Sequence, residues 1–436
     1  MASISSKLPV IFLAGLAASF TSHAPPRTEQ VERADAVVSA WVADGRIPGA
    51  VLLVSRDGRI VFEKAYGWAQ VYDYDDGQYG ASAAGESRPT AIRRLADPQP
   101  MTTDTVFDLA SVTKVMATTF AAMLLVDAGD LDLDAPVDAY LPDFRDGEPT
   151  PTGGPSGAGK GMITIRHLLT HRAGIDQWQP VYYDADNARQ AYDYIRDRPL
   201  GWPVGSGRHY SDLGFMLLGL VVNGVAGQSL EVFLEERLYG PLGLAATGFR
   251  PSTRSEAASP TGPFAATSHG NPYEHRMVHD PGFGYLIEKD ADAWNGWRRY
   301  TLAGEVNDGN AYHAFGGVAG HAGLFSTAAD LQVLLQVLLD RGEYGGRRYV
   351  RAETVDMFLT ITGDEQALGW QAPAGLPPGS FTHPGFTGTY VAGIPSENIG
   401  VILLTNRQNP GVDDDGQYPT IGELQTAVMH AVLGQR

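Results

Sequence analysis

Strand patterns lie near both ends of the chain, and helical patterns fill the long segment between them. Residues 50–55 and 60–67 flank an Asp57-Gly58 turn, which is the signature of a β-hairpin. A third apolar strand is predicted over 399–406. Because both ends of the chain contribute strands, we expect them to form one α/β layer, with the middle of the chain inserted into it. The sequence therefore predicts an α/β fold with a helical insertion.

The predicted helices follow from apolar residues at helical spacing. An N-terminal helix is expected from Thr28 to about Asp44, and a closing helix from about Ile421 to Leu433. In the middle of the chain, helices are expected over 112–128, 165–169, 213–224 and 230–238. We therefore expect one domain over 25–434, with an α/β part over about 28–105 and 310–434 and a helical part over about 106–309. Two irregular stretches, 146–161 and 251–297, are interpreted either as substrate walls and lids or as ordinary surface loops.

The composition favours an ordinary globular protein over a nucleic-acid-binding one. The 436 residues are 43% hydrophobic and carry a formal net charge of −18. A phosphate-binding surface needs clustered Lys and Arg, so nucleic acid and anionic membrane surfaces are disfavoured as partners. The chain has no cysteine, so its fold needs no disulfide.

Residues 1–24 have the order of a secretory signal peptide. Lys7 precedes a short apolar run over 8–16, and a small-residue site ends at Ala24. The run is too short to span a bilayer comfortably. We expect cleavage near Ala24 and a secreted or periplasmic bacterial protein without a stable membrane span. The alternative is a disordered apolar tail.

Ser111 and Lys114 are the first candidates for chemistry. Three residues apart at the start of an amphipathic helix, they share one helix face, so the amine can take the proton of the hydroxyl. That pair is the minimum apparatus of an activated serine nucleophile. A Ser-x-x-Lys pattern is weak by itself, because chains of this length contain such pairs by chance.

Two further motifs follow along the chain. Tyr210 stands at a turn before an apolar helix, where a phenol can relay a proton from the nucleophile to a leaving group. The segment from Thr382 to Thr389 contains His383, Gly385 and Phe386 in strand-like surroundings. A glycine-spaced edge strand can aim a backbone N–H at a developing oxyanion.

Together and in this order the motifs resemble the serine penicillin-recognising family, which contains class C β-lactamases, D-Ala-D-Ala carboxypeptidases and related esterases. The likeness covers about residues 28–434 and includes the segments 107–114, 167–175, 239–244 and 319–326. The resemblance implies an antiparallel sheet flanked by helices with an inserted helical domain. Ser111 is then the acylated nucleophile, Lys114 its general base and Tyr210 the proton relay.

The resemblance also assigns substrate-binding roles. The backbone N–H groups of Ser111 and Phe386 would form the oxyanion hole, and His383 takes the place of the residue that helps to bind a substrate carboxylate. His321, in Gly-His-Ala-Gly, is a weaker candidate for lining the cleft, with a packing or turn role as the alternative. No cofactor is implied.

Two residues depart from the family pattern. Asp212 replaces the usual asparagine two residues after Tyr210, and its carboxylate would favour the charged form of Lys114. Pro384 stands where threonine is frequent and supplies neither a hydroxyl nor an N–H. A second interpretation uses Ser211 instead of Tyr210 as the relay, as in a broken Ser-Asp-Asn motif.

Other motifs are interpreted as structural. His167 and His171 have a spacing that can bind zinc, but no third ligand is evident, so a structural pair is favoured and no metal is expected. The run from Gly154 to Lys160 matches a phosphate-binding loop except that Gly161 replaces the Ser or Thr, and a flexible loop is favoured. The acidic run 413–415 lacks calcium-loop spacing.

We therefore expect a secreted serine hydrolase that forms an acyl-enzyme on Ser111 and acts on a small molecule or peptide. The resemblance favours D-Ala-D-Ala peptides of peptidoglycan. The alternatives are an esterase of small acyl esters, then a β-lactamase, and a catalytically silent binding protein that has kept the cleft.

Overall fold

The computed structural model describes residues 28–74, 92–144, 159–250, 262–283, 285, 287 and 289–435. The predicted signal peptide, residues 1–24, lies outside the described residues, as does most of the Gly154–Lys160 motif. Both therefore stay predictions.

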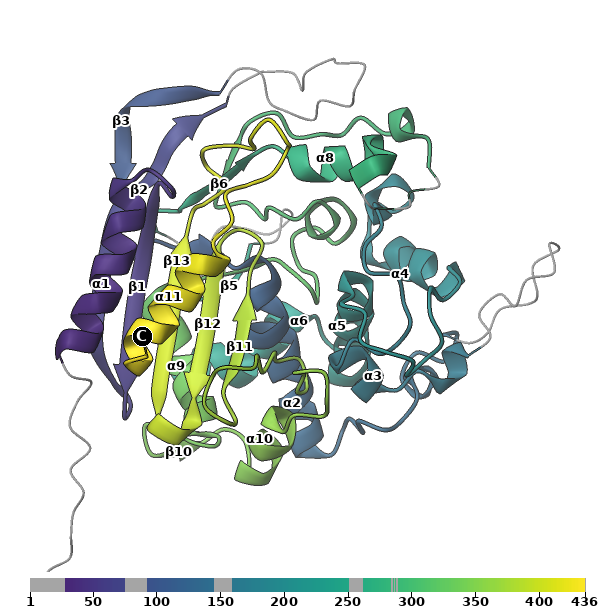
Figure 1. Ribbon diagram of the computed structural model, residues 1–436. Helices are drawn as coiled ribbons and strands as arrows, with labels where there is room; N and C mark the ends of the chain where they lie inside the picture. The colour runs from purple at the N-terminus through teal and green to yellow at the C-terminus, as the bar shows by residue number, and fades with distance from the viewer. Residues whose placement is uncertain are drawn as a thin grey trace, which may run out of the picture.

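A six-stranded sheet is built from the two ends of the chain, in the order β11-β12-β13-β1-β2-β3. Its strands are β1 (Gly49–Arg56), β2 (Arg59–Asp73), β3 (Arg93–Pro100), β11 (Phe381–Pro384), β12 (Thr389–Ile394) and β13 (Ile399–Thr405). All neighbouring pairs are antiparallel, and β1 and β13, from opposite ends of the sequence, lie side by side at the centre with Leu53 opposite Ile402 (Figure 1). The predicted α/β fold with an antiparallel sheet is confirmed.

The predicted hairpin is formed by β1 and β2. Its turn residues Asp57 and Gly58 both have positive φ, 50° and 74°. Positive φ at both central positions is what a type I′ turn requires, and Asp-Gly is a preferred pair for it. The turn chemistry therefore sets the register of the first two strands.

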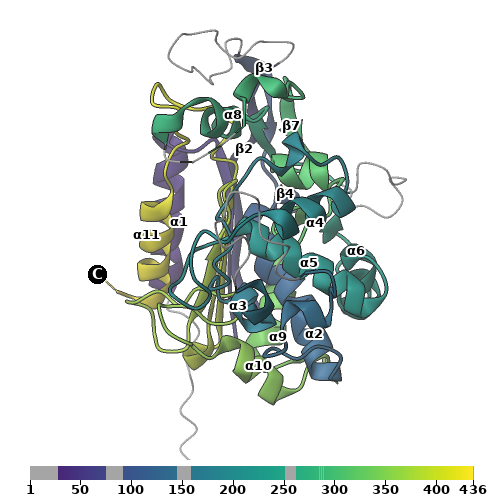
Figure 2. The ribbon, with the colours of Figure 1, turned by 90° about the vertical axis from the view of Figure 1, so that its right-hand side faces the viewer.

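Helices cover both faces of the sheet. On one face lie α1 (Thr28–Ala43) and α11 (Gly422–Leu433), which contact each other and bury Val38 and Val428 against the strands. On the other face lies α9 (Ala328–Leu339), followed by the helical layer (Figure 2). Because both faces are covered, Leu52 and Leu53 on consecutive positions of β1 are both fully buried, in different clusters.

The helical layer comes from the middle of the chain. Its helices are α2 (Phe120–Ala128), α3 (Ile165–Leu169), α4 (Ala188–Asp197), α5 (Asp212–Ala226), α6 (Leu230–Leu234), α7 (Gly240–Leu242), α8 (Pro272–His279) and, from later in the chain, α10 (Ala352–Leu359). Short strands connect it: β4 (Phe107–Asp108), β5 (Gly248–Phe249) and β8 (Leu324–Ser326) form one sheet, β6 (Ala266–His269) and β7 (Thr301–Ala303) a second, and β9 (Glu343–Tyr344) and β10 (Arg347–Arg348) a third. The proposed boundaries between an α/β and a helical part stay a prediction.

The segment that carries Ser111 and Lys114 is helical but irregular. A 3₁₀ turn over Ala110–Val112 is followed by a π-helical stretch over Lys114–Thr119 and then by α2. The whole segment Ala110–Ala128 has the length and hydropathy of a membrane span, but 83% of it is buried inside the protein. The core helix of a soluble protein passes the same test, so this helix is weak evidence for a membrane.

Candidate active site

The turn before Ser111 is strained and is held by a buried carboxylate. Ala110 has φ 44°, in the left-handed region that residues other than glycine rarely adopt. Asp108 accepts the N–H of Ala110 at 2.8 Å and that of Asn307 at 2.6 Å. Burial raises the pKa of Asp108 to about 6, although these two N–H bonds oppose the shift. Asp108 thus fixes the conformation that starts the nucleophile helix.

Lys114 is fully buried and lies among three oxygens. Its Nζ is 3.0 Å from Ser111 Oγ, 2.7 Å from an Asp212 carboxylate oxygen and 3.2 Å from the backbone carbonyl of His321. Burial alone would lower the pKa of Lys114, but the charge of Asp212 and the contact with Tyr210 outweigh it and raise the pKa above its ordinary value. Lys114 therefore carries a positive charge at neutral pH.

Tyr210 completes the group around Ser111. Its ring packs against the ring of His171 at 4.4 Å, and Lys114 Nζ lies 4.9 Å from the Tyr210 ring centre. Burial raises the pKa of Tyr210, while the nearby Lys114 charge and hydrogen bonds to Lys114 and Ser111 act in the opposite direction. Tyr210 is consequently a neutral phenol at pH 7, ready to donate a proton.

The residues after Tyr210 have separate tasks. Asp212 is the first residue of α5 and pairs with Lys114. Ser211 caps the same helix, because its Oγ accepts the N–H of Gly214 at 2.9 Å and donates to the carbonyl of Asp176 at 2.6 Å. Both hydrogen bonds point the Ser211 hydroxyl into the helix cap. The geometry thus favours Tyr210 over Ser211 as the relay.

His383 lies on β11 at the edge of the cavity and is neutral. Desolvation by burial, with the charges of Lys114 and Arg208, lowers the pKa of His383 to about 3. Its Nδ1 lies 2.8 Å from the carbonyl of Pro384, which as an acceptor requires the proton on Nδ1. Nε2 is then a lone-pair acceptor, and the neutral ring carries no positive charge.

The strand end that carries Gly385 and Phe386 is anchored to the nucleophile turn. Thr387 Oγ1 donates to the carbonyl of Asp108 at 2.7 Å, and Thr389 Oγ1 donates to that of Leu109 at 3.0 Å. A Cβ at Gly385 would lie 2.5 Å from the Leu109 carbonyl oxygen, so only glycine permits this approach. Within the described residues the N–H of Phe386 has no hydrogen-bond partner, which suits an oxyanion donor.

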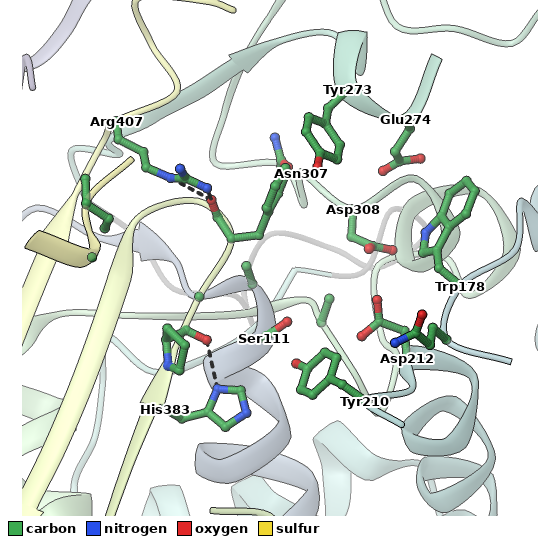
Figure 3. A pocket seen from close by; sticks show the side chains of 18 of the residues that line it. Ser111, Trp178, Tyr210, Asp212, Tyr273, Glu274, Asn307, Asp308, His383 and Arg407 are labelled. Atoms are coloured by element: carbon green, nitrogen blue, oxygen red, sulfur yellow. Dashed lines mark hydrogen bonds between the residues drawn. The ribbon is translucent and has the colours of Figure 1, made fainter. Parts of the chain in front are cut away.

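These groups open into one cavity of about 700 Å³. Ser111 and Tyr210 lie at its centre (Figure 3). Asp212, Asp308, Glu274 and Trp178 lie along one side of the cavity, and Arg407 and His383 along the other. The irregular stretch 251–297 contributes Glu274, with Tyr273, Met277 and Tyr285, and therefore supplies one wall.

Asp308 and Glu274 form a second acidic group behind the nucleophile. Glu274 is buried, and desolvation together with the charge of Asp308 raises its pKa to about 8, against the N–H that Gly309 donates at 2.7 Å. Burial acts to raise the pKa of Asp308 as well, but the contact with His321 Nε2, at 2.9 Å, holds it below its ordinary value. At neutral pH Glu274 is protonated and Asp308 is ionised.

His321 does not line the cavity. Its side chain is buried behind Asp308, and its backbone carbonyl accepts a hydrogen bond from Lys114. His321 therefore contacts two charged residues, Asp308 through its ring and Lys114 through its backbone carbonyl. The sequence signal, a histidine in a glycine-rich turn, could not distinguish these roles.

The histidine pair has structural roles as well. His167 Nδ1 contacts Thr164 in the cap of α3, and His171 Nδ1 accepts the N–H of Ser211 at 3.1 Å. Among the described residues, no cluster of three or more His, Cys, Asp or Glu is arranged to hold a metal ion. Asp413 in the acidic run bonds the N–H groups of Asp415 and Gln417 within its own loop.

Several functional candidates were missed by sequence reasoning. They are Asp108, Trp178, Arg208, Glu274, Asp308 and Arg407. No local sequence pattern marks these residues as functional, because the tertiary fold brings them to the site. No spacing rule links Asn307 and Asp308 to Ser111 in the sequence.

The fold and the serine–lysine–tyrosine geometry define a serine hydrolase site of the β-lactamase and transpeptidase type. The family profile described as "Beta-lactamase" matches residues 34–426. A protein of Bacillus subtilis (strain 168) named "N-acetylmuramyl-L-alanine amidase" is 33% identical over 436 residues, which cover 93% of this chain and 90% of that protein. The chain belongs to the β-lactamase family.

Other relatives and solved structures agree with the family. "Putative D-alanyl-D-alanine carboxypeptidase" of Escherichia coli (strain K12) is 32% identical over 431 residues, covering 93% of this chain and 90% of that protein. EstCE1, "a hydrolase with promiscuous acyltransferase activity", superposes with a TM-score of 0.63 at 23% identity, covering 93% of this chain and 98% of that one. A class C β-lactamase from Rhodobacter sphaeroides gives 0.60 at 22% identity, with 92% and 99% covered. These two structures show the fold alone.

Proposed function

We propose that the protein is a serine D-Ala-D-Ala carboxypeptidase acting on peptidoglycan peptides through an acyl-enzyme on Ser111. The observation that carries the proposal is the position of Lys114 Nζ, 3.0 Å from Ser111 Oγ and 2.7 Å from Asp212. The names of the Escherichia coli and Bacillus subtilis relatives both describe hydrolysis of an amide bond that involves alanine.

The charged state of Lys114 sets the route of the proton. A protonated lysine cannot take a proton from Ser111 unless it gives one up. Asp212 lies within hydrogen-bond distance to receive it. As Ser111 Oγ attacks the scissile carbonyl, Lys114 transfers a proton to Asp212 and takes the proton of Ser111. Asp212 is then the ultimate acceptor, and Lys114 ends the step with its charge unchanged.

The rest of the reaction uses the other groups of the site. The N–H groups of Ser111 and Phe386 stabilise the tetrahedral oxyanion. When the C–N bond breaks, Tyr210 donates its proton to the leaving amine and recovers one from the Lys114 and Asp212 pair. Water then attacks the acyl-enzyme by the same route in reverse, which frees the carboxylic acid and Ser111.

Release of D-alanine from an N-acylated D-Ala-D-Ala peptide tests the proposal. We expect release by the wild-type protein and none by Ser111→Ala. A matched L-Ala-L-Ala peptide serves as the control for stereochemical preference. If the wild-type protein releases no D-alanine, the carboxypeptidase proposal is wrong.

The second candidate is an esterase of small acyl esters. It is favoured by the neutral His383 and by Pro384, because neither supplies a charge or hydroxyl for a terminal carboxylate. Rapid hydrolysis of a neutral phenyl ester with no peptide turnover would support this candidate. A β-lactamase would instead turn over benzylpenicillin, and a silent binding protein would hydrolyse none of these substrates.

We also propose that the protein is exported after cleavage near Ala24. The proposal rests on the order of Lys7, the apolar run 8–16 and the small residues before Ala24. Expression of the full chain in a bacterium and N-terminal sequencing of the periplasmic fraction tests it. A full-length protein that stays in the cytoplasm would contradict it.

A further inference from the structure

Among the described residues that line the cavity, Arg208 is a cation whose partner is a single neutral amide. Two arginines line the cavity, Arg208 and Arg407. The guanidinium of Arg407 donates to the Phe386 carbonyl at 3.0 and 2.7 Å and to the Pro419 carbonyl at 2.8 Å. Arg407 is thus committed to holding the strand end that carries Phe386.

Arg208 is held differently. Its Nε donates to Gln366 Oε1 at 2.8 Å, and in the part of the chain that the structure describes it has no carboxylate partner. Gln366 is fully buried, and its own Nε2 donates to the carbonyl of Ala367 at 2.8 Å, which fixes Oε1 toward Arg208. A neutral amide therefore positions the guanidinium through Nε and leaves both Nη groups available.

Arg208 also lies on the side of the cavity where a carboxylate receptor is missing. It lines the same cavity as Ser111 and His383, and its charge contributes to the lowered pKa of His383. His383 is a neutral acceptor there and Pro384 has no donor, so among the described residues that line this side the positive charges are those of Arg208 and Arg407. Arg407 is already bound to carbonyl groups.

We propose that Arg208 is the specificity-determining residue that binds the carboxylate of the leaving group. The inference rests on the proposed function in one respect, since the leaving D-alanine of a carboxypeptidase carries its carboxylate on the carbon next to the amide nitrogen. A guanidinium held at Nε presents a two-pronged edge that matches a carboxylate. In this protein Arg208 takes over carboxylate binding from the segment 382–389, where His383 is neutral and Pro384 has no donor.

The proposal is tested with two ester substrates that differ in one group. One is a phenyl ester of an N-acylated D-alanine, and the other is the same ester with a carboxylate on the phenyl ring. The wild-type protein should prefer the carboxylated ester through a lower KM. In Arg208→Gln we expect the ratio of kcat/KM for the carboxylated ester to kcat/KM for the neutral ester to fall about tenfold to a hundredfold. Arg208→Lys, which keeps the charge but loses the fork, should retain part of the preference.

Each outcome decides the matter. A wild-type protein without preference for the carboxylated ester overturns the inference, as does an equal loss on both esters in Arg208→Gln, which would indicate a structural role. If neither ester is turned over, the same comparison is made as binding to Ser111→Ala, with an N-acylated D-Ala-D-Ala peptide and its C-terminal amide. A preference for the carboxylated ester, without release of D-alanine from peptides, would support the proposed role of Arg208. It would refute only the proposal that the protein is a carboxypeptidase.

Discussion

Two parts of the cavity wall, one around Ser111 and one around Glu274, treat buried charge in opposite ways. On the nucleophile side, Lys114 and Asp212 neutralise each other at 2.7 Å, and the pKa of Lys114 is raised. On the wall made by α8 and the 307–309 segment, two carboxyls lie close together, and the pKa of Glu274 rises to about 8. The first side keeps its charges by pairing them, whereas the second reduces its charge by keeping a proton.

The difference shows which side is built for proton transfer. A paired lysine and carboxylate next to a hydroxyl can exchange protons without a change in net charge. A carboxylic acid beside an ionised carboxylate can instead change its charge near pH 8, when the solution or a bound group changes. The predictions below test each side in turn, beginning with the largest expected effect.

Removal of the lysine should break the nucleophile side. We expect Lys114→Met to lower kcat/KM for a neutral ester by about a hundredfold to ten-thousandfold, since general-base catalysis by a positioned group contributes on the order of 10²–10⁴. The matched control is Lys64→Met. It removes an exposed lysine of β2 that pairs with Asp35 of α1. Equal activity of the two variants would show that Lys114 has no catalytic role.

Removal of the carboxylate should destabilise the same side. The folded-state pKa of Lys114 lies above its unfolded value of 10.5, so this stabilisation is fully present at pH 7 and is lost only as the pH rises through the folded-state pKa. Asp212→Asn leaves a buried cation unpaired, and we expect a loss of about 3 kcal/mol in urea unfolding at pH 7. The double variant Lys114→Met/Asp212→Asn should recover part of the lost free energy of unfolding. If Asp212→Asn alone is as stable as the wild type, the ion pair does not stabilise the fold.

On the wall made by α8, Glu274→Gln should change the pH dependence of stability. The ordinary pKa of this carboxyl is 4.5 and the folded value is about 8, so the folded protein keeps a proton that the unfolded chain loses between these pH values. The contribution of Glu274 to stability therefore decreases as the pH rises from 4.5 to 8. Relative to the wild type, the variant should gain on the order of 1–3 kcal/mol between pH 5 and pH 9. Glu353→Gln, at an exposed position of α10, is the control and should show no such gain.

The smallest expected effect concerns His383. Because its pKa is about 3, His383 does not titrate between pH 5 and 8. We expect the limbs of the kcat/KM profile in that range to keep their positions in His383→Asn, whose amide can still donate to the Pro384 carbonyl. If the kcat/KM profile of the wild type has a limb near pH 6.5 that this variant lacks, His383 titrates in that range. The claim that His383 is neutral would then be wrong.

The same division between the two sides decides what could be predicted from the sequence. Ser111, Lys114, Tyr210 and Asp212 lie in two short motifs on helix starts, where the spacing itself places side chains on one face. The β1–β2 hairpin and β13 were predicted for a similar reason, because turn chemistry and apolar runs are local. The strand β3, with polar residues over much of its length, gave no such pattern and was missed.

The rest depends on contacts between distant segments. Glu274 and Asp308 meet because α8 packs against the 307–309 turn, and Gly309 donates across that contact. Likewise the neutral state of His383 follows from burial, which a sequence motif does not encode. Arg208 lies two residues before Tyr210 in the sequence, but the partner that holds its Nε, Gln366, is 158 positions further along the chain.

The central claim is that Ser111 is acylated. Intact-mass spectrometry of the protein without residues 1–24, after incubation with benzylpenicillin, tests it most directly when Ser111→Ala is measured alongside. The account predicts a penicilloyl adduct on the wild-type protein that maps to the peptide containing Ser111 and is absent from the variant. An adduct of equal yield on both proteins, or one that maps to another residue, would contradict it.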